Sequence, residues 1–413
     1  MIDVNLLRSE PDIFRTGMKK KNADPSLVDK FIMLDEEWRS FKKSSDDLRA
    51  KQKGFGPNDR DESRKVKEDI LALEEKITVL EEERSFILSQ IPNLPFDDVP
   101  EGKDDNDNAL LKEVGKPTEF SFTPKDYMDL SVGMIDTDRA TRISGSRFGY
   151  IMGDLAMLEM SMIRMAMDTL IPYGFKLVLP PVMIRPEVLR SMGKGKFIDA
   201  GDAFYVSEDD LYMVASAEQS LAPMFMGETL AVSDLPIRLM GFSSCFRKEA
   251  GSYGKDTRGI LRVHQFNKLE MFSFCLPEKS KEEHEFLLAR QEELMGKLEL
   301  PYRVVVNSSG DMGFDAAKQY DIEAWFPGQN KYRETHSCSN TTDFQSRGLG
   351  TIYKIRGEDG KEKNGFVHTL NATAFSERPL LSILENFQTE DGRIVVPKAL
   401  RSYFGKDEII VSR

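Results

Sequence analysis

Two stretches near the N-terminus repeat apolar residues at alternating steps of four and three, which is the spacing of a coiled-coil seam. The first seam, interrupted only by Ser45, consists of Leu27, Phe31, Leu34, Trp38, Phe41 and Leu48. The second seam, interrupted only by Arg84, consists of Val66, Ile70, Leu73, Ile77, Leu80, Ile87 and Ile91. Between them, the Gly- and Pro-containing segment 54–59 ends one helix before the next begins. Residues of about 27–91 are therefore expected to fold as an antiparallel helical hairpin.

This hairpin has two interpretations that the sequence leaves open. Heptads alone favour a spacer or a dimerisation element. The charges off the seam favour an arm that contacts RNA, because basic residues gather toward the tip and acidic residues occupy the base of the second helix. The basic set consists of Lys42, Lys43, Arg49, Lys51, Lys53, Arg60, Arg64 and Lys65. Charge separated along a rod indicates an oriented anionic partner.

The remaining chain predicts a second, larger domain. A length of 413 residues exceeds what a single core usually reaches. The segment 91–108 is rich in Pro, Asp and Asn and reads as a linker, so residues 1–108 and 109–413 are expected to form two domains. From about residue 110, short apolar strand-like runs alternate with helical stretches such as 154–170 and 281–298. This mixture predicts an α+β domain on a predominantly antiparallel sheet.

Composition excludes several classes of protein. A net charge of −12 argues against a general nucleic-acid coat, so a nucleic-acid partner must meet local basic patches. The three cysteines lie far apart and form no CxxC pair, which indicates neither a disulfide framework nor a Cys-pair zinc site. No apolar run approaches the roughly 18 residues of a membrane span, and no signal-peptide layout is present. We expect a protein of the cytoplasm without a membrane partner.

Residues 246–270 have the pattern of a long antiparallel hairpin that lines a polyanion site. Charged residues occupy several alternate positions in both arms, which flank a Gly-rich basic tip. Arg247 and Glu249 lie two residues apart and are expected on the same strand face, where one holds a phosphate and the other accepts from an amine. An exposed hairpin with ordinary cross-strand ion pairs is the alternative.

Two further segments carry candidate chemistry. Glu334 and Ser337, three residues apart, can supply two hard oxygen ligands to a magnesium ion that also bridges phosphates, although a hydrogen-bonded loop explains the same residues. In the segment 366–388 a strand leads into an apolar helix, and Pro379 suits its first turn. Arg378 therefore lies beside a helix N-terminus that favours anions. A strand that turns into a buried helix leaves much the same pattern without the arginine.

The three segments, in this order, resemble the motifs of class II aminoacyl-tRNA synthetases. The run Arg262-Val263-His264-Gln265-Phe266 resembles the seryl-tRNA synthetases in particular, and the resemblance extends over nearly the whole chain. It implies a class II catalytic domain with an N-terminal coiled-coil arm, and homodimerisation through a first motif near 154–181. It also implies an ATP-dependent serine–tRNA ligase that forms seryl-adenylate from L-serine and charges tRNA(Ser), with tRNA(Sec) as a further candidate. ATP and Mg²⁺ are implied, and no zinc is expected.

The resemblance also implies roles for single residues. Arg247 and Arg378, the catalytic pair, bind the α- and γ-phosphates of ATP. The other ATP-binding residues are Glu249 at the adenine amine, Phe266 under the base, Arg262 at the phosphate tail, and Glu334 and Ser337 as magnesium ligands. The serine site consists of Ser216, Glu218, Arg247, Glu270, Asn371 and Thr373, and the basic set of the hairpin contacts tRNA.

Two departures from the family pattern bear on activity. Ser216 stands where threonine is usual, and Glu377 stands beside Arg378 where glycine is usual. An acidic residue there either weakens ATP binding or points away. Two rival functions follow: a paralogue that activates an amino acid for another acceptor, and a non-catalytic RNA-binding descendant. The arm at 27–91 argues against the first rival. The second is disfavoured because the motifs keep their charged residues, Arg247, Glu249, Glu334 and Arg378.

Overall fold

The computed structural model describes residues 1–56, 58–250, 256, 258–356 and 362–411. By their contacts these residues divide into two compact units, Met1–Leu94 and Pro95–Arg413. Each unit is described by itself. The functional division at residues 108 and 109, into a tRNA-binding part and a catalytic part, stays a prediction.

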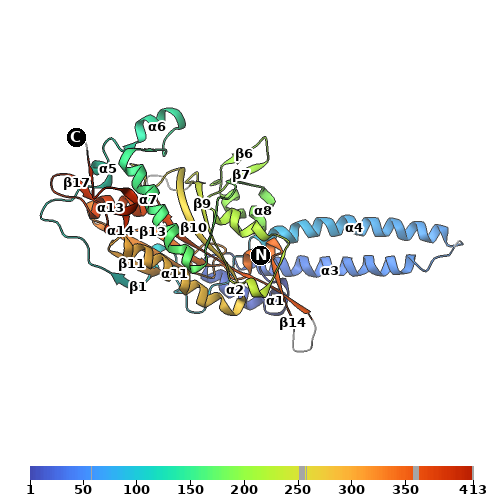
Figure 1. The fold of residues 1–413 in the computed structure, drawn as a ribbon. Helices are drawn as coiled ribbons and strands as arrows, with labels where there is room; N and C mark the ends of the chain where they lie inside the picture. The colour runs from blue at the N-terminus through green and yellow to red at the C-terminus, as the bar shows by residue number, and fades with distance from the viewer. Residues whose placement is uncertain (57, 251–255, 257, 357–361, 412–413) are drawn as a thin grey trace. The chain divides into compact units, whose positions relative to one another are not determined.

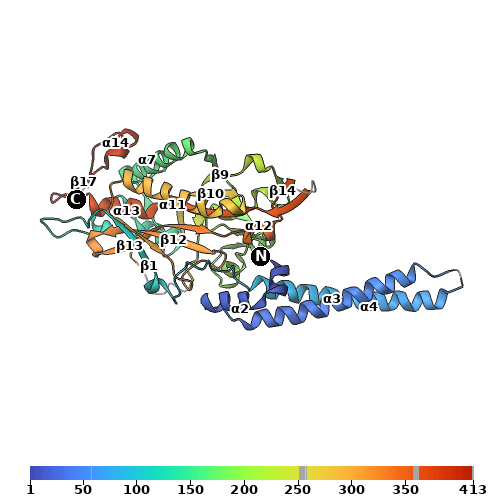
Figure 2. The same cartoon turned by 90° about the horizontal axis from the view of Figure 1, so that it is seen from below.

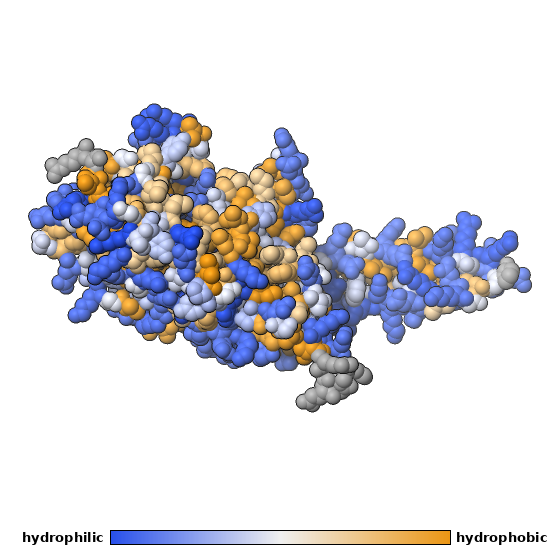
Figure 3. All heavy atoms as spheres, in the orientation of Figure 1, coloured by the Kyte–Doolittle hydropathy of each residue, from blue (hydrophilic) through white to orange (hydrophobic). Residues whose placement is uncertain are grey.

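The first unit is entirely helical. Two short helices, α1 (Val4–Ser9) and α2 (Pro11–Lys20), precede the long helices α3 (Ser26–Gln52) and α4 (Arg60–Ser89). The long helices run side by side and are joined at one end, so the predicted helical hairpin is confirmed (Figure 1 and Figure 2). Seam residues from both helices are buried between them, namely Phe31, Leu34, Val66, Ile70, Ile77, Leu80 and Ile87. Hydrophilic side chains dominate the outer surface of the hairpin (Figure 3).

The polar interruption at Arg84 has a structural cause. The Arg84 guanidinium donates a 2.7 Å hydrogen bond to Asp35, and its carbon Cζ lies 4.3 Å from the ring centre of Trp38. Asp35 is only 1% exposed and also accepts two 2.8 Å hydrogen bonds from Arg8. Burial opposes the charge of Asp35, but these partners outweigh it and lower its pKa. If the two long helices paired in a shifted register, the buried Asp35 carboxylate would lose the Arg84 guanidinium. The cluster therefore favours one register of α3 against α4.

The second unit is built on an eight-stranded sheet. Its strands lie in the order β1-β11-β12-β13-β16-β10-β9-β4, and only the pair β4 and β9 is parallel. The predicted predominantly antiparallel sheet is therefore confirmed. In sheet order the strands span Ala109–Val114, Tyr302–Val306, Lys318–Phe326, Lys331–Asn340, His368–Ser376, Gln265–Cys275, Ile237–Phe246 and Lys176–Val178.

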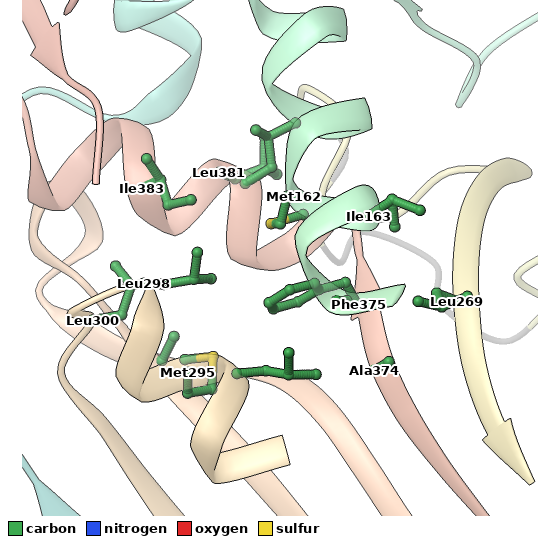
Figure 4. Packing of buried hydrophobic residues seen from close by; sticks show 14 of the residues in the cluster. Met162, Ile163, Leu269, Met295, Leu298, Leu300, Ala374, Phe375, Leu381 and Ile383 are labelled. Atoms are coloured by element: carbon green, nitrogen blue, oxygen red, sulfur yellow. The ribbon is translucent and has the colours of Figure 1, made fainter. Parts of the chain in front are cut away.

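Three helices pack on this sheet and close the main core. They are α7 (Gly153–Leu170), α11 (Ser280–Lys297) and α13 (Glu377–Asn386), and their apolar side chains surround Phe375 of β16 (Figure 4). Successive side chains of a strand alternate between the two faces of a sheet. Leu269 and Met271 of β10 therefore enter this core, whereas Lys268 and Glu270 point to the opposite face, where the candidate site lies.

Smaller elements complete the second unit. The remaining α-helices are α5 (Tyr127–Leu130), α6 (Thr137–Ser144), α8 (Pro186–Ser191), α9 (Gly195–Asp199), α10 (Glu218–Leu221), α12 (Phe344–Leu349) and α14 (Lys398–Phe404). The small sheets pair β2 (Ile135–Asp136) with β3 (Tyr150–Ile151), β5 (Met183–Ile184) with β7 (Leu211–Met213) and β6 (Tyr205–Val206), β14 (Ile352–Arg356) with β15 (Glu362–Phe366) and β8 (Thr229–Leu230), and β17 (Arg393–Val395) with β18 (Glu408–Ile410). Across the described ranges, no helix is both long and apolar enough to span a bilayer.

Candidate active site

A cleft opens on the polar face of the large sheet. It is formed by β10, β13, β16, the start of α13 and the segment that joins β9 to β10. Every residue expected to bind ATP lines this cleft, together with Thr373 of the expected serine site. The ATP set consists of Arg247, Glu249, Arg262, Phe266, Glu334, Ser337 and Arg378. Residues far apart in the sequence thus meet in one place.

The predicted hairpin exists, but its strands are displaced along the sequence. Strand β9 ends at Phe246 and β10 begins at Gln265, so the expectation that Arg247 and Glu249 share a strand face was wrong. Glu249 instead has a left-handed backbone with φ of 55°. The Arg247 N–H still donates across the hairpin to the His264 carbonyl at 3.0 Å, but the Lys248 N–H donates to the Asp202 carbonyl at 2.8 Å, so the pairing of the two arms ends there. Most of the predicted tip, residues 251–255 and 257, lies outside the described residues.

Charged side chains surround an aromatic ring in the cleft. Arg262 donates a 2.6 Å hydrogen bond to the carboxylate of Glu249, which fixes both side chains at the cleft wall. The guanidinium carbon of Arg247 lies 5.2 Å from the ring centre of Phe266. A flat ring beside cations suits a nucleobase that carries phosphates, because bases stack on aromatic faces and phosphates attract guanidinium groups.

A β-bulge brings Glu334 and Ser337 to the same side of β13. In a regular strand, residues three apart point to opposite faces. Here Ile322 of β12 pairs with His336 and Glu323 pairs with Glu334, so Thr335 is an extra residue in β13. The extra residue reverses the alternation, and both candidate magnesium ligands line the cleft.

Arg378 lies in the first turn of α13, at the edge of the cleft. The hydroxyl of Ser376 caps this helix by accepting from the backbone N–H of Arg378 at 3.4 Å. The guanidinium donates to the carboxylate of Glu334 at 3.0 Å and to the Glu334 carbonyl at 2.9 Å. The protein walls of the cleft partly desolvate Glu334, whose side chain is 49% exposed, but the charge of Arg378 outweighs this effect and lowers the pKa of that carboxyl.

The carboxyl group of Glu377 is bonded away from the arginine beside it. Strand β16 ends at Ser376, opposite Lys268, and the carboxyl of Glu377 accepts from the next N–H of β10, that of Asn267, at 3.1 Å. The side chain therefore extends the contact between two strands where the ladder stops. Glu377 still lines the cleft, with its carboxyl held by the backbone N–H of Asn267, so its effect on ATP binding stays a prediction.

A second buried carboxyl group shares this contact. The side-chain amide of Asn267 donates to Glu159 of α7 at 3.0 Å, and Glu159 and Glu377 are 4% and 7% exposed. Burial and then the nearby charge of Glu159 raise the pKa of Glu377 to about 8. Burial also raises the pKa of Glu159. A proton on Glu377 at neutral pH lets the two carboxyl groups lie close without two full charges.

The other expected serine-binding residues lie next to the cleft and are buried. Asn371 donates to Oε1 of Glu218 at 3.1 Å, and the hydroxyl of Ser216 accepts from the Glu218 N–H at 3.2 Å. The segment that carries Ser216 and Glu218 packs directly on β9, because a Cβ on Gly241 would lie 2.8 Å from the Cβ of Ala217. The structure thus brings these three residues together.

Glu270 belongs to the same buried group. Its carboxylate lies 2.5 Å from Nζ of Lys268, and burial raises its pKa despite that partner. A second bulge, at Ala374, sets Thr373 opposite Glu270 across the ladder. Sequence reasoning missed Lys268, which lines the cleft, although its place two residues before Glu270 on one strand could have revealed it.

The basic set of the helical hairpin is exposed throughout. Three of its members make ion pairs within the hairpin, Arg49 with Glu74, Lys51 with Glu62 at 2.7 Å and Arg64 with Glu68 at 3.2 Å. Exposed pairs of this kind contribute little to stability. The cations therefore remain accessible to an anionic partner.

Comparison with known proteins places this site in a class. Residues 204–387, which contain all the residues that line the cleft, match the family model described as tRNA synthetase class II core domain (G, H, P, S and T). The antiparallel sheet and the cleft are accordingly those of a class II aminoacyl-tRNA synthetase.

The first unit and the full-length relatives narrow the class to one family. Residues 1–95 match the Seryl-tRNA synthetase N-terminal domain. The chain is 43% identical to the Serine–tRNA ligase of Corynebacterium diphtheriae, over 98% of this chain and 99% of that protein. The seryl-tRNA synthetase of Pyrococcus horikoshii, solved with ATP, has a TM-score of 0.92 at 38% identity and full coverage of both chains. The cytoplasmic serine–tRNA ligase of Naegleria fowleri, solved with AMP, has a TM-score of 0.89 at 33% identity, with 99% and 98% coverage. The chain belongs to the seryl-tRNA synthetase family.

The pKa of Glu377 predicts how stability depends on pH. The folded protein holds a proton on Glu377 up to about pH 8, whereas the unfolded chain releases it near the ordinary value of 4.5. The free energy of unfolding should therefore fall between these pH values, by at most about 1.4 kcal/mol per pH unit from this group. Glu377→Gln should remove that contribution, which urea unfolding at pH 5, 6, 7 and 8 would measure. Glu119→Gln, at an exposed glutamate, should leave the slope unchanged, and parallel curves for parent and Glu377→Gln would contradict the assignment.

Proposed function

We propose that this protein is a serine–tRNA ligase that activates L-serine with ATP and transfers the seryl group to tRNA(Ser). The observation that carries the proposal is the cleft itself, where the charged and aromatic residues of three separate segments converge in a chain that matches serine–tRNA ligases over its length. Neither rival function is favoured by a specific observation. We infer that the protein works in the cytoplasm, where tRNA is charged.

In the first step, an oxygen of the serine carboxylate attacks the α-phosphorus of ATP, and the bond to the β-phosphate oxygen breaks as pyrophosphate leaves. The positive charge of Arg247 at the α-phosphate and of Arg378 at the γ-phosphate stabilises the charge that develops on the phosphate oxygens. Glu249 accepts from the adenine amine and Phe266 stacks the base, which holds the reacting phosphorus in place. Arg262 extends this hold to the phosphate tail. In the second step, the terminal ribose hydroxyl of tRNA takes the seryl group from the adenylate, and AMP leaves.

The donor set of the cleft fits Mg²⁺. Glu334 and Ser337 point into one space and offer a carboxylate and a hydroxyl, which are hard oxygen ligands. Within the part of the chain that the structure describes, no group of three or more His, Cys, Asp or Glu residues could hold a metal ion. Mg²⁺ commonly takes one or two protein ligands and completes its shell with water and phosphate. Bound there, the ion would neutralise charge on the phosphates, and Arg378 would be released from Glu334 to reach them.

The serine substrate fits the buried group beside the cleft. Glu218 supplies a carboxylate for the α-ammonium, with the hydroxyl of Ser216 as a second acceptor. Glu270, Asn371 and Thr373 supply polar partners for the rest of the substrate. An amino acid without the serine hydroxyl would leave buried partners unpaired, which disfavours its binding.

Loss of either member of the Arg378 and Glu334 pair should abolish activation. Arg378→Ala removes the γ-phosphate cation and Glu334→Ala removes a magnesium ligand, so serine-dependent exchange of labelled pyrophosphate into ATP should fall at least about 100-fold in each. The matched control is Arg393→Ala, which breaks an arginine–carboxylate pair with Glu408 away from the cleft. Unchanged turnover in both cleft variants, with folding intact, would refute their roles.

We infer that the basic set of the hairpin binds the long variable arm of tRNA by phosphate contacts. A variant that changes Lys42, Lys43, Arg60 and Lys65 to Gln should raise the KM for tRNA at least about tenfold and lessen its dependence on salt, because fewer counterions are released on binding. Pyrophosphate exchange should stay at the parent rate. The control changes acidic residues of the same hairpin, Glu81 and Glu82, to Gln. If the quadruple variant charges tRNA normally, the arm has another role.

We also infer a homodimer through the edge of the sheet that β4 forms. Apolar side chains are exposed on and just after β4 and on α7, the α-helix that precedes β4 in the chain. Leu177 of β4, Leu179 one residue after it and Met157 of α7 are exposed by 46%, 74% and 56%. Exposed apolar surface of this kind is typical of an interface, and Figure 3 shows apolar side chains gathered on the face where α7 lies. The exposed chain edge of β4 also leaves backbone groups that a second copy can cover.

The dimer can be tested at both edges of the same sheet. Leu179→Asp should place a charge in the interface, so analytical ultracentrifugation should show a shift from dimer to monomer. Leu110→Asp is the matched control, because Leu110 lies on the opposite edge strand β1 and is 54% exposed. A parent protein that sediments as a monomer, or a Leu179→Asp variant that remains a dimer, would contradict this interface.

A further inference from the structure

A lysine from outside the family motifs reaches the carboxylate that we assign to the substrate ammonium. The ammonium group of Lys194 lies 3.0 Å from Oε1 of Glu218 and 2.8 Å from Oδ2 of Asp315. The side chains of Glu218 and Asp315 are only 10% and 5% exposed, and that of Lys194 is 21% exposed. Burial disfavours the charge of Lys194, but the two carboxylates outweigh burial and raise its pKa. The lysine therefore stays charged in the pocket.

Gln345 ties the two carboxylates together and fixes how they point. Its amide nitrogen donates to Oε1 of Glu218 and to Oδ2 of Asp315, both at 2.8 Å, while its oxygen accepts from the hydroxyl of Thr369 at 3.0 Å. Asn371 adds a third donor to the same Oε1. These three donors to Glu218, from Lys194, Gln345 and Asn371, all meet Oε1, so Oε2 is the oxygen that we assign to a substrate.

Close backbone packing delivers Lys194 to this place. The loop before it lies against α12, the helix that carries Gln345. A Cβ on Gly193, whose φ is 85°, would lie 2.3 Å from the ring of Phe344, and a Cβ on Gly348 would lie 1.7 Å from the carbonyl oxygen of Ser191. Only glycine fits at both contacts. The lysine is thus held by the fold and is not a mobile surface side chain.

Two carboxylates share one ammonium group in this buried cluster. Lys268 pairs with Glu270, whereas Lys194 lies between Glu218 and Asp315 and contacts both. Without Lys194, two carboxylates joined through a single amide would repel each other in a poorly solvated site. Glu218 would then turn away from Asp315, and this change would weaken its hold on an ammonium group.

We propose that Lys194 is a positioning residue for amino-acid recognition, which together with Asp315 and Gln345 holds Glu218 so that Oε2 receives the α-ammonium of serine. The inference rests on the proposed function, because it assigns that ammonium to Glu218. It adds a specificity element that lies outside the three catalytic motifs.

The first test is Lys194→Met in the full-length protein, with serine binding followed by isothermal titration calorimetry and KM values taken from pyrophosphate exchange. We expect the Kd and the KM for serine to rise at least about tenfold, while the KM for ATP stays within about twofold, because only the ammonium contact changes. Lys279→Met is the matched control, since Lys279 makes a comparable 2.9 Å ion pair with Glu282 on the surface. Unchanged serine affinity in a folded Lys194→Met variant would overturn the inference. A parent protein that binds no serine would overturn the proposed function and this inference with it.

Two further measurements separate positioning from a merely structural role. Lys194→Met combined with Asp315→Asn restores the charge balance of the pocket, and we expect this double variant to regain serine affinity to within about threefold of the parent. Serinamide keeps the ammonium group, whereas glycerate replaces it with a hydroxyl. As competitive inhibitors, serinamide should weaken in Lys194→Met and glycerate should not. Equal weakening of both, or no recovery in the double variant, would show that the lysine only supports the fold.

Discussion

The ladder between β10 and β16 is the contact on which the catalytic unit depends. It joins the strand that carries Phe266, Lys268 and Glu270 to the strand that carries Thr373, and it leads directly into the helix that presents Arg378. The core on one face of these strands holds them in register, because Leu269 and Phe375 are fully buried there. Side chains on the two faces belong to the same strands and therefore share one register. Apolar packing on one face thus sets the positions of the charged side chains on the other.

Ion pairs lie along this polar face. Arg378 with Glu334, Arg262 with Glu249 and Lys268 with Glu270 form a set in which each side chain is already oriented. Such pairs limit the mutual repulsion of like charges in a confined space and restrict the conformations of long side chains. A substrate that brings phosphates and an ammonium group exchanges partners with them, so binding replaces ion pairs without having to order disordered side chains.

Features that depend on residues close together in the sequence could be predicted from the sequence, and features that depend on distant residues could not. The helical hairpin was predictable because the seam repeats locally, and the cleft residues were predictable because they sit in compact motifs. The turn at Glu249 was not, since it depends on Asp202, a residue far away in the chain. The same holds for Arg84, which pairs with Asp35 across 49 positions, and for Lys194, which meets Asp315 across 121. Single charged residues with distant partners leave no periodic signal.

The bulges at Thr335 and Ala374 make strand length itself part of the site. Each adds one residue that the ladder does not need, and each reverses the side on which the following side chains emerge. Deleting Thr335 would give a more regular strand and would send Glu334 or Ser337 to the wrong face of the sheet. The fold therefore tolerates a shorter strand better than the chemistry does, and in relatives of this protein a change in strand length at these two points would mark lost catalysis more surely than many substitutions.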